Sequence, residues 1–397
     1  MNILVINSGS SSIKFQLIRM PIARVLASGM VERIGIEGGS IQYKSERGSL
    51  KYDEDFADHN VGLKKIATVL MNPQSGVIDS ADEVDAVGHR VVHGGQKFSE
   101  INRVTEDVKE NIRQLFSLAP LHNPANLTGI EVAEALFPNA EQFCVFDTAF
   151  FSSIPQKAYQ FAIPQRFLNE EHIRTYGFHG TSHKYVSAKA QEYLNAENLK
   201  LITIHLGNGC SMTALENGKP IDTSLGFGPA NGLIMGTRAG DIDQTVVFYL
   251  QEKLGYSVQE VNTLLNKESG MLGLTGYSDL RDIEAKAEAG DAVCKLALEM
   301  NAYRIRKYIG AYAAALNGLD ALVFTAGIGE NSSTIRRLVC EKMDFLGISI
   351  DVSANLERKK GIHEIQSKEA KVKVLIIPTN EELEIANQVY NSVGVEN

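Results

Sequence analysis

Two stretches of this sequence, about half a chain apart, repeat one strand–turn–strand pattern, and this repeat most constrains the fold. In the first, the apolar run Ile3–Ile6 is followed by turn-forming residues from Asn7 to Ser12 and by alternating apolar residues from Ile13 to Leu17. Apolar β-branched runs predict buried strands, and alternation predicts half-buried ones. The stretch is therefore expected to be a β-hairpin, either a plain polar turn or a tip that binds phosphate oxygens.

The second copy of the pattern, Leu201–Leu215, favours the phosphate-binding interpretation. Its apolar run ends at a tight Gly-Asn-Gly turn, and Gly207 falls in register with Gly9 while Ile204 falls in register with Ile6. Self-similarity at this distance indicates two related halves. Two glycine-bearing strand turns in one chain also indicate one ligand that both halves share.

Composition excludes several classes of protein. A length of 397 residues predicts two or three domains, and a net charge of -9 argues against a nucleic-acid surface. No apolar run approaches the roughly 18 residues of a membrane helix, and the start of the chain lacks the features of a signal peptide. The four scattered cysteines form no CxxC pair, so neither a disulfide framework nor a cysteine zinc site is predicted. We expect a cytoplasmic protein with neither membrane nor nucleic-acid partners.

Charged side chains follow two predicted strands. The pattern of Val84–Val92 predicts a strand carrying Arg90, and that of Gln142–Phe146 predicts a strand ending at Asp147. A carboxylate at such a strand end either faces the cleft of an α/β fold or caps a turn. His89 and His93 are four residues apart, but that spacing does not converge on a metal in a strand, so we interpret both as structural.

Two glycine-rich loops also carry candidate functional residues. His179 lies between Gly177 and Gly180 just before a predicted helix, and His183 follows four residues later. A zinc pair is one interpretation, but the glutamate of HExxH is absent, and an exposed catalytic or anion-binding His179 is favoured. Arg238 lies in a loop with five glycines, where the alternative role is a structural ion pair with a nearby aspartate.

The last third of the chain contains a further strand–turn–helix pattern. The strand Leu322–Thr325 leads into a predicted glycine turn, 326–331, with a helix expected from about Ser332. This arrangement is typical of nucleotide sites in α/β folds, although a lone GxG is a weak signal. Thr379 and Glu382 fit a capping box for the final helix, in which Glu381 has the alternative role of a first-turn carboxylate.

Eight motifs along the chain resemble the acetokinase family, within the acetate and sugar kinase, Hsp70 and actin superfamily. Each motif alone is weak, but all eight occur in the family's order. They are NSGSSSIKF at Asn7–Phe15, GHRVVHGG at Gly88–Gly95, FDTAF at Phe146–Phe150, YGFHGTSH at Tyr176–His183, HLGNGCS at His205–Ser211, MGTRAGD at Met235–Asp241, TAGIGEN at Thr325–Asn331 and TNEE at Thr379–Glu382.

The resemblance implies an α/β fold of two duplicated ribonuclease-H-like domains, as in actin-like ATPases, around a nucleotide cleft. It also implies that the last helix returns to the first domain. The expected acyl-substrate domain therefore comprises residues 1–149 and 383–397, and the expected nucleotide-binding domain comprises residues 150–382.

The resemblance further implies reversible transfer of the γ-phosphoryl group of ATP to acetate, giving acetyl phosphate and ADP. Catalysis would use Asp147, His179 and Arg238, and substrate binding would use Arg90, Val92, Leu121, Phe178 and Pro229. Mg²⁺, or Mn²⁺ in its place, would lie near Asn7 and Glu381. The nucleotide would contact Lys14, His205, Leu206, Gly207, Asn208, Gly209, Asp279, Leu280, Arg281, Gly327, Ile328, Gly329, Glu330 and Asn331.

The chain departs from the family pattern at two places. Phe151 stands where the family commonly has histidine, and the loop from Gly276 to Asp279 is one residue shorter than usual, which weakens the assignment of Asp279–Arg281. Propionate or butyrate kinase activity stays open because those enzymes share the motifs. A non-catalytic ATP switch of the actin or Hsp70 kind is the alternative from another class. The family also implies a homodimer.

Overall fold

A computed structural model of the chain describes residues 1–120 and 122–394. The chain divides into two compact units, the first comprising Met1–Ser152 with the residues from Asn380 onward and the second comprising Ser153–Thr379. The domains expected from the family have their boundaries after residue 149 and before residue 383. In the structure, Glu381 and Glu382 belong to the first unit.

Unit 1 is built on one eight-stranded sheet with the order β5-β4-β3-β2-β1-β6-β8-β7. Its first five strands form an antiparallel meander, while β6 and β8 run parallel to β1. The elements are β1 Asn2–Ser8, β2 Ser12–Arg19, β3 Arg24–Glu32, β4 Ser40–Ser45, β5 Gly48–Asp53, α1 His59–Leu70, β6 Ala86–Val91, β7 Asn102–Arg103, α2 Glu106–Gln114, α3 Asn123–Leu136, β8 Glu141–Phe146 and α15 Glu381–Ser392.

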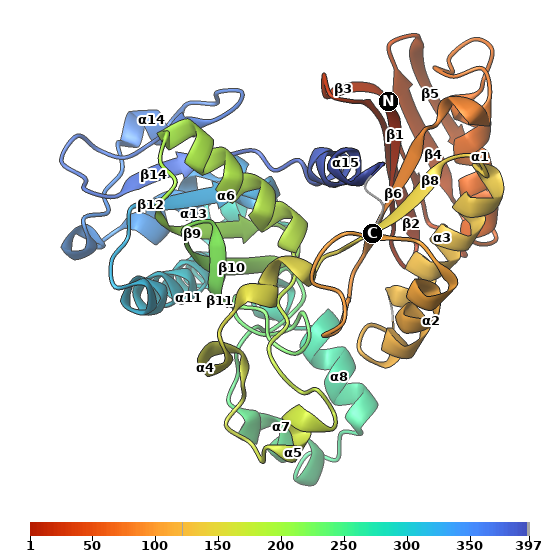
Figure 1. Cartoon of the computed structure of the whole chain (residues 1–397). Helices are drawn as coiled ribbons and strands as arrows, with labels where there is room; N and C mark the ends of the chain where they lie inside the picture. Colours follow the sequence, from red (N-terminus) through yellow and green to blue (C-terminus); the bar gives the residue numbers. More distant parts are fainter. Residues whose placement is uncertain (121, 395–397) are drawn as a thin grey trace. The chain divides into compact units, whose positions relative to one another are not determined.

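The first predicted hairpin is confirmed, and the C-terminal helix covers the sheet to which it belongs. β1 pairs with β2 so that Ile6 faces Phe15. Helix α15 packs on β1 and β6 (Figure 1). A Cβ atom on Gly88 of β6 would come within 2.7 Å of Ile385 and 2.9 Å of Val389, so the glycine allows this close contact. Helix α15 therefore belongs to unit 1 although it follows unit 2 in the sequence.

Unit 2 contains a six-stranded sheet with the order β11-β10-β9-β12-β14-β13. Its elements are α4 Gln156–Tyr159, α5 Arg166–Asn169, α6 Gly180–Leu194, β9 Lys200–Leu206, β10 Cys210–Glu216, β11 Lys219–Thr223, α7 Gln244–Glu252, α8 Val258–Lys267, α9 Gly270–Thr275, α10 Leu280–Glu288, α11 Ala292–Leu316, β12 Ala321–Thr325, α12 Ala326–Asn331, α13 Ser333–Cys340, α14 Val352–Leu356, β13 His363–Glu364 and β14 Lys373–Ile376.

The two sheets repeat one topology, which confirms the predicted duplication. In each, an antiparallel meander of three strands (β1–β3 or β9–β11) is extended by two strands parallel to its first member (β6 and β8, or β12 and β14). Ile204 of β9 occupies the place of Ile6 of β1. The second predicted hairpin is also confirmed, with Leu201 facing Leu215.

Several local predictions are wrong. The segment expected to be a glycine turn, 326–331, forms the short helix α12, which begins just after Thr325 and has Ala326 at a φ of 64°. Residues Gly270–Thr275 form a further short helix, α9. The last helix is capped by Asn380, whose side chain accepts a hydrogen bond from the Leu383 amide, because the Thr379 hydroxyl instead contacts Ser182.

No helix within residues 1–120 and 122–394 is both long enough and apolar enough to cross a membrane.

Candidate active site

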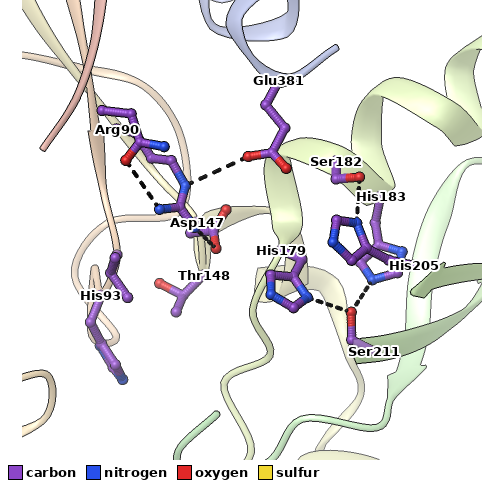
Figure 2. A network of polar contacts seen from close by, with 12 residues as sticks. Arg90, His93, Asp147, Thr148, His179, Ser182, His183, His205, Ser211 and Glu381 are labelled. Carbon is purple, nitrogen blue, oxygen red and sulfur yellow. Dashed lines mark hydrogen bonds and ion pairs between the residues drawn. The ribbon is translucent and has the colours of Figure 1, made fainter. Parts of the chain in front are cut away.

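Arg90 is the centre of a polar cluster in unit 1. It lies near the end of β6, and its Nη2 donates to Asp147 Oδ2 at 2.8 Å while its Nη1 lies 3.4 Å from Asn7 Oδ1 (Figure 2). Its Nε is 3.9 Å from Glu381 Oε2. These four residues come from the ends of β1 and β6, the turn after β8, and the start of α15, so the fold brings together residues that are far apart in sequence.

Burial and neighbouring charges have opposing effects on the pKa of Arg90 in this cluster. Burial alone would lower the pKa of the Arg90 guanidinium, but Asp147 and Glu381 raise it above its ordinary value. Burial raises the pKa of Glu381, and the charges of Asp147 and Glu382 add to that rise. Glu382 in turn lies 2.5 Å from Lys14 Nζ. The cluster is therefore rich in carboxylates that further positive charge would stabilise.

The predicted metal ligands, Asn7 and Glu381, both lie at this cluster. Among residues 1–120 and 122–394 there is no group of three or more His, Cys, Asp or Glu side chains placed to hold a metal ion. One amide oxygen and one carboxylate oxygen nevertheless suit Mg²⁺, which takes oxygen ligands and commonly retains several waters. The raised pKa of Glu381 fits a position where a cation would offset carboxylate crowding.

His179 occupies the junction between a glycine-containing loop and α6 in unit 2. Its backbone is in the left-handed region, with φ 60° and ψ 28°, and it stands at the N-cap position of the helix. Its Nδ1 is 2.8 Å from Ser211 Oγ, and its ring stacks on His205 with centroids 4.4 Å apart. The N-terminal end of a helix favours anions, so this location suits a residue that contacts phosphate.

Arg238 is a largely buried cation whose guanidinium is not neutralised by a carboxylate in the described part of the chain. Its Nη1 donates to the Pro229 carbonyl at 2.9 Å. The alternative ion pairs with Asp241 or Asp243 do not form, because Asp241 binds the Gly232 amide and Tyr308, and Asp243 caps α7. Burial lowers the pKa of Arg238, which reflects the cost of its unpaired charge.

Gly209 is the point where His179 and Arg238 meet. A Cβ atom built on this glycine would lie 3.2 Å from His179 Nε2 and 3.8 Å from Arg238 Nη1. The absence of a side chain there leaves the two nitrogens facing a common space. A guanidinium beside a ring nitrogen that carries a proton would bind anionic oxygen atoms.

A cavity of about 670 Å³ in unit 2 is lined by many of the residues that were predicted to contact the nucleotide. Its predicted lining residues are Gly207, Asn208, Asp279, Leu280, Arg281, Gly327, Ile328 and Asn331. Leu206 lines a small adjoining cavity. His205, Gly209, Gly329 and Glu330 are outside the cavity lining, and Lys14 belongs to unit 1. Asp279 and Arg281 reach the cavity as an ion pair with a 2.5 Å contact, despite the shortened loop before them.

Four lining residues were not predicted, namely Ser278, Glu284, Ser332 and Arg358. Ser332 caps α13 and hydrogen-bonds Glu284 of α10, so two distant helices meet there. Burial raises the pKa of this glutamate. A basic run begins at Arg358 and offered a sequence signal, whereas nothing local in the sequence distinguishes Glu284.

The predicted acyl-pocket residues are divided between the units. Val92 is buried in unit 1, just after β6, while Phe178 and Pro229 belong to unit 2. Leu121 lies outside the described residues. The two histidines interpreted as structural are buried in unit 1, where His89 contacts Gln142 Oε1 at 2.8 Å and His93 Nδ1 accepts from the Gly95 amide. Burial lowers the pKa of each histidine to about 4.

Comparison with known proteins identifies the family. The model of the acetokinase family matches residues 2–387. The chain belongs to the acetokinase family. It is 60% identical to the acetate kinase of Flavobacterium johnsoniae, over 98% of this chain and 99% of that protein. As a member of this family, the protein is a kinase.

Two solved structures of acetokinase homologues are similar along their whole length. The crystal structure of Porphyromonas gingivalis acetate kinase has a TM-score of 0.93 and 45% identity, covering 98% of this chain and 99% of that one. A propionate kinase from Francisella tularensis gives a TM-score of 0.92 and 40% identity, with 98% of each chain covered. These likenesses confirm the predicted α/β fold of two duplicated domains.

Proposed function

We propose that this protein reversibly transfers the γ-phosphoryl group of ATP to acetate, forming acetyl phosphate and ADP. The observation that supports this most strongly is Arg238, a largely buried guanidinium without a carboxylate partner among the described residues, facing the same space as His179 Nε2. A transferring phosphoryl group would supply the missing negative charge. The curated acetate kinases at 50–60% identity support acetate as the acceptor.

The chemistry needs charge neutralisation rather than a strong base. A carboxylic acid with a pKa of roughly 4 is already ionised at neutral pH, so the nucleophile is preformed. The barrier arises from bringing one anion to another, and it is lowered by positioning and by fixed positive charge. Arg90 would hold the substrate carboxylate, and Asp147 would orient Arg90 through their 2.8 Å hydrogen bond rather than remove a proton.

We propose that Asn7 and Glu381 hold Mg²⁺ together with the phosphates of the nucleotide. Bound magnesium would offset part of the phosphate charge. The nucleotide itself would occupy the cavity lined by Gly207, Arg281 and Ile328. His179 would donate to a phosphoryl oxygen, and Arg238 would bind the developing charge bidentately.

The acetate assignment has two competitors. Propionate or butyrate kinase activity would require a larger acyl pocket, and the acetate kinases at 50–60% identity disfavour that alternative. A non-catalytic ATP switch would need no carboxylate-binding arginine. A hydroxamate assay with ATP and acetate, propionate or butyrate separates these functions. Acyl hydroxamate that is most abundant with acetate supports the proposal. Nucleotide binding without acyl phosphate would favour the switch.

We also propose a homodimer and a cytoplasmic location. Helix α7 exposes apolar side chains, with Phe248 56% and Tyr249 58% exposed, and exposed apolar patches often mark protein–protein contact surfaces. All four cysteines are buried and free of disulfides, as is common for proteins in a reducing compartment. Light scattering of the purified protein would test the oligomeric state.

A further inference from the structure

A buried hydrogen-bonded chain leads from the sheet of unit 2 to His179. Thr203 Oγ1 lies 2.7 Å from His183 Nδ1, and His183 Nε2 lies 2.7 Å from Ser211 Oγ. The same serine oxygen lies 2.8 Å from His179 Nδ1 (Figure 2). Thr203, His183 and Ser211 are each completely inaccessible to solvent. The chain therefore joins strands β9 and β10 to both histidines of the α6 segment.

The proton count of a hydroxyl limits how this chain can be arranged. Ser211 has one O–H proton but contacts two ring nitrogens. It can donate to His183, donate to His179, or accept from both. In the first and third arrangements the proton of neutral His179 resides on Nδ1, which leaves a lone pair on Nε2. Only donation from Ser211 to His179 leaves an N–H on Nε2.

The surroundings of His179 Nε2 select among these arrangements. Nε2 faces the space beside Gly209 into which Arg238 also points. A lone pair there would repel an anionic oxygen, whereas an N–H would bind it. A doubly protonated His179 would place a second positive charge near Arg238, whose own charge is already costly there. The ring of His205 stacks on the His179 ring, with the two centroids 4.4 Å apart.

We propose that Ser211 and His183 are positioning residues that hold neutral His179 in the tautomer with its proton on Nε2. Donation then runs in one direction, from Thr203 to His183, from His183 to Ser211, and from Ser211 to His179. The terminal N–H is aimed at the anion. This inference rests on the proposed function in one respect, which is that the anion is a phosphoryl group.

The chain offers a matched control for its first member. Thr213 of β10 pairs directly with Thr203 of β9 and is equally buried. Its Oγ1 makes no hydrogen bond within the described part of the chain. Thr203→Val and Thr213→Val therefore remove the same kind of buried hydroxyl from neighbouring positions, but only the first variant breaks the chain.

The direct test is nitrogen-15 NMR of histidine-labelled protein at neutral pH, with the His179 signal assigned by its loss in His179→Gln. The wild type should show a proton on Nε2 of neutral His179. Ser211→Ala should shift His179 toward the Nδ1–H form, and Thr203→Val should do so more weakly, while Thr213→Val should match the wild type. A wild-type Nδ1–H form, a charged ring, or an unchanged tautomer in Ser211→Ala would overturn the proposal.

Kinetics provide a second readout. Loss of a preorganised donor typically costs about 10²-fold or more in kcat, so Ser211→Ala should lose at least about 10-fold in kcat with little change in the KM for ATP. An equal loss in Thr203→Val and Thr213→Val would contradict a role for the chain. If the folded wild type made no acyl phosphate yet showed the Nε2–H tautomer, the proposed function would fail while this inference would stand.

Discussion

The two halves of this kinase share one sheet topology but differ at the ends of their equivalent strands. In unit 1, β6 carries Arg90 and leads into the loop at His93, whereas in unit 2 the equivalent β12 leads directly into α12, which lines the cavity of that unit. Under the proposed function, this difference would let two copies of one sheet bind different ligands, because the segment that follows the equivalent strand differs.

The two halves also differ in how their site arginines, Arg90 and Arg238, are neutralised. Arg90 lies among Asp147, Glu381 and Asn7, so its charge is matched within unit 1. Arg238 donates to a carbonyl and has no carboxylate partner among the described residues. A matched cation is part of the structure, and an unmatched one is available to a ligand. We therefore expect that replacing Arg90 mainly reduces folding stability and that replacing Arg238 mainly reduces activity.

Arg238→Ala should cause the largest loss of activity. An arginine that stabilises a phosphoryl-transfer transition state contributes roughly 10³-fold or more to kcat. Steady-state kinetics should show that loss, with a folding stability close to that of the wild type. Arg337→Ala, an exposed arginine on α13, is the control and should retain full activity. A kcat within a few-fold of wild type would make Arg238 merely structural.

Arg90→Ala should instead reduce stability. Removing one member of a buried ion pair leaves the other charge uncompensated and typically costs about 3–5 kcal/mol. Denaturant unfolding should show a drop of about 3 kcal/mol for Arg90→Ala, and a much smaller one for Arg238→Ala. Adding Asp147→Asn to Arg90→Ala should restore part of the loss. Equal destabilisation by the two arginine variants would break the contrast between them.

The predicted acyl pocket should discriminate between carboxylate substrates by the length of their carbon chain. Val92 is buried next to β6, and the residues expected to share its pocket include Phe178 but no glycine. Burying a methylene stabilises by about 0.8 kcal/mol, whereas overpacking costs roughly 1–3 kcal/mol, so kcat/KM should fall by up to about 10-fold from acetate to propionate, and again to butyrate. Val92→Ala should narrow that gap. Rising kcat/KM with chain length in the wild type would refute the acetate assignment.

A smaller effect, on the pH dependence of stability, is expected from one pair of facing strand residues that differs between the two sheets. Unit 2 pairs Ala214 with Asp222, where unit 1 pairs Leu17 with Ala27. Burial raises the pKa of Asp222 to about 6. The folded state therefore binds a proton more tightly than the unfolded chain, and the protein loses stability as pH rises from about 4 to about 6.

The matching variant is Asp222→Asn, which keeps an oxygen acceptor for the Thr223 amide. It should gain about 1–2 kcal/mol of stability at pH 7, a figure reduced to allow for partial solvent screening. The gain should disappear near pH 4, where the carboxyl of the wild type is largely protonated in the folded state. Unfolding curves at both pH values provide the measurement. A gain of equal size at both would exclude titration of Asp222 as its cause.

Regular, local patterns made much of the fold predictable. Both hairpins follow from alternating apolar residues, and the matching register of their sequences is enough to indicate the duplication. Helix α7 was missed because its run Val246–Leu250 is apolar without a helical period, and none of its side chains is buried. The α12 segment was wrongly predicted because glycines usually break helices, and the turn into it depends on the left-handed Ala326.

Candidate site residues could be proposed from the sequence where a motif marks them, but not where they depend on contacts between distant segments. Arg238 and His179 were proposed from glycine-rich loops. Their convergence at Gly209 and the hydrogen-bonded chain through Ser211 and His183 depend on strand pairing between β9 and β10 and on the packing of α6. No local sequence pattern predicts either the convergence or the hydrogen-bonded chain.

Binding of ADP, measured by calorimetry well below the unfolding midpoints of the variants, most directly tests whether the two halves serve different ligands. Arg281→Ala removes a charged group from the cavity of unit 2, and a hydrogen bond to a charged group contributes about 1.5–3 kcal/mol, so ADP affinity should fall by about 10-fold or more. Arg90→Ala alters only unit 1 and should leave ADP affinity within about two-fold of wild type while raising the KM for acetate. Equal weakening of ADP binding by both variants would contradict the division of ligands between the halves.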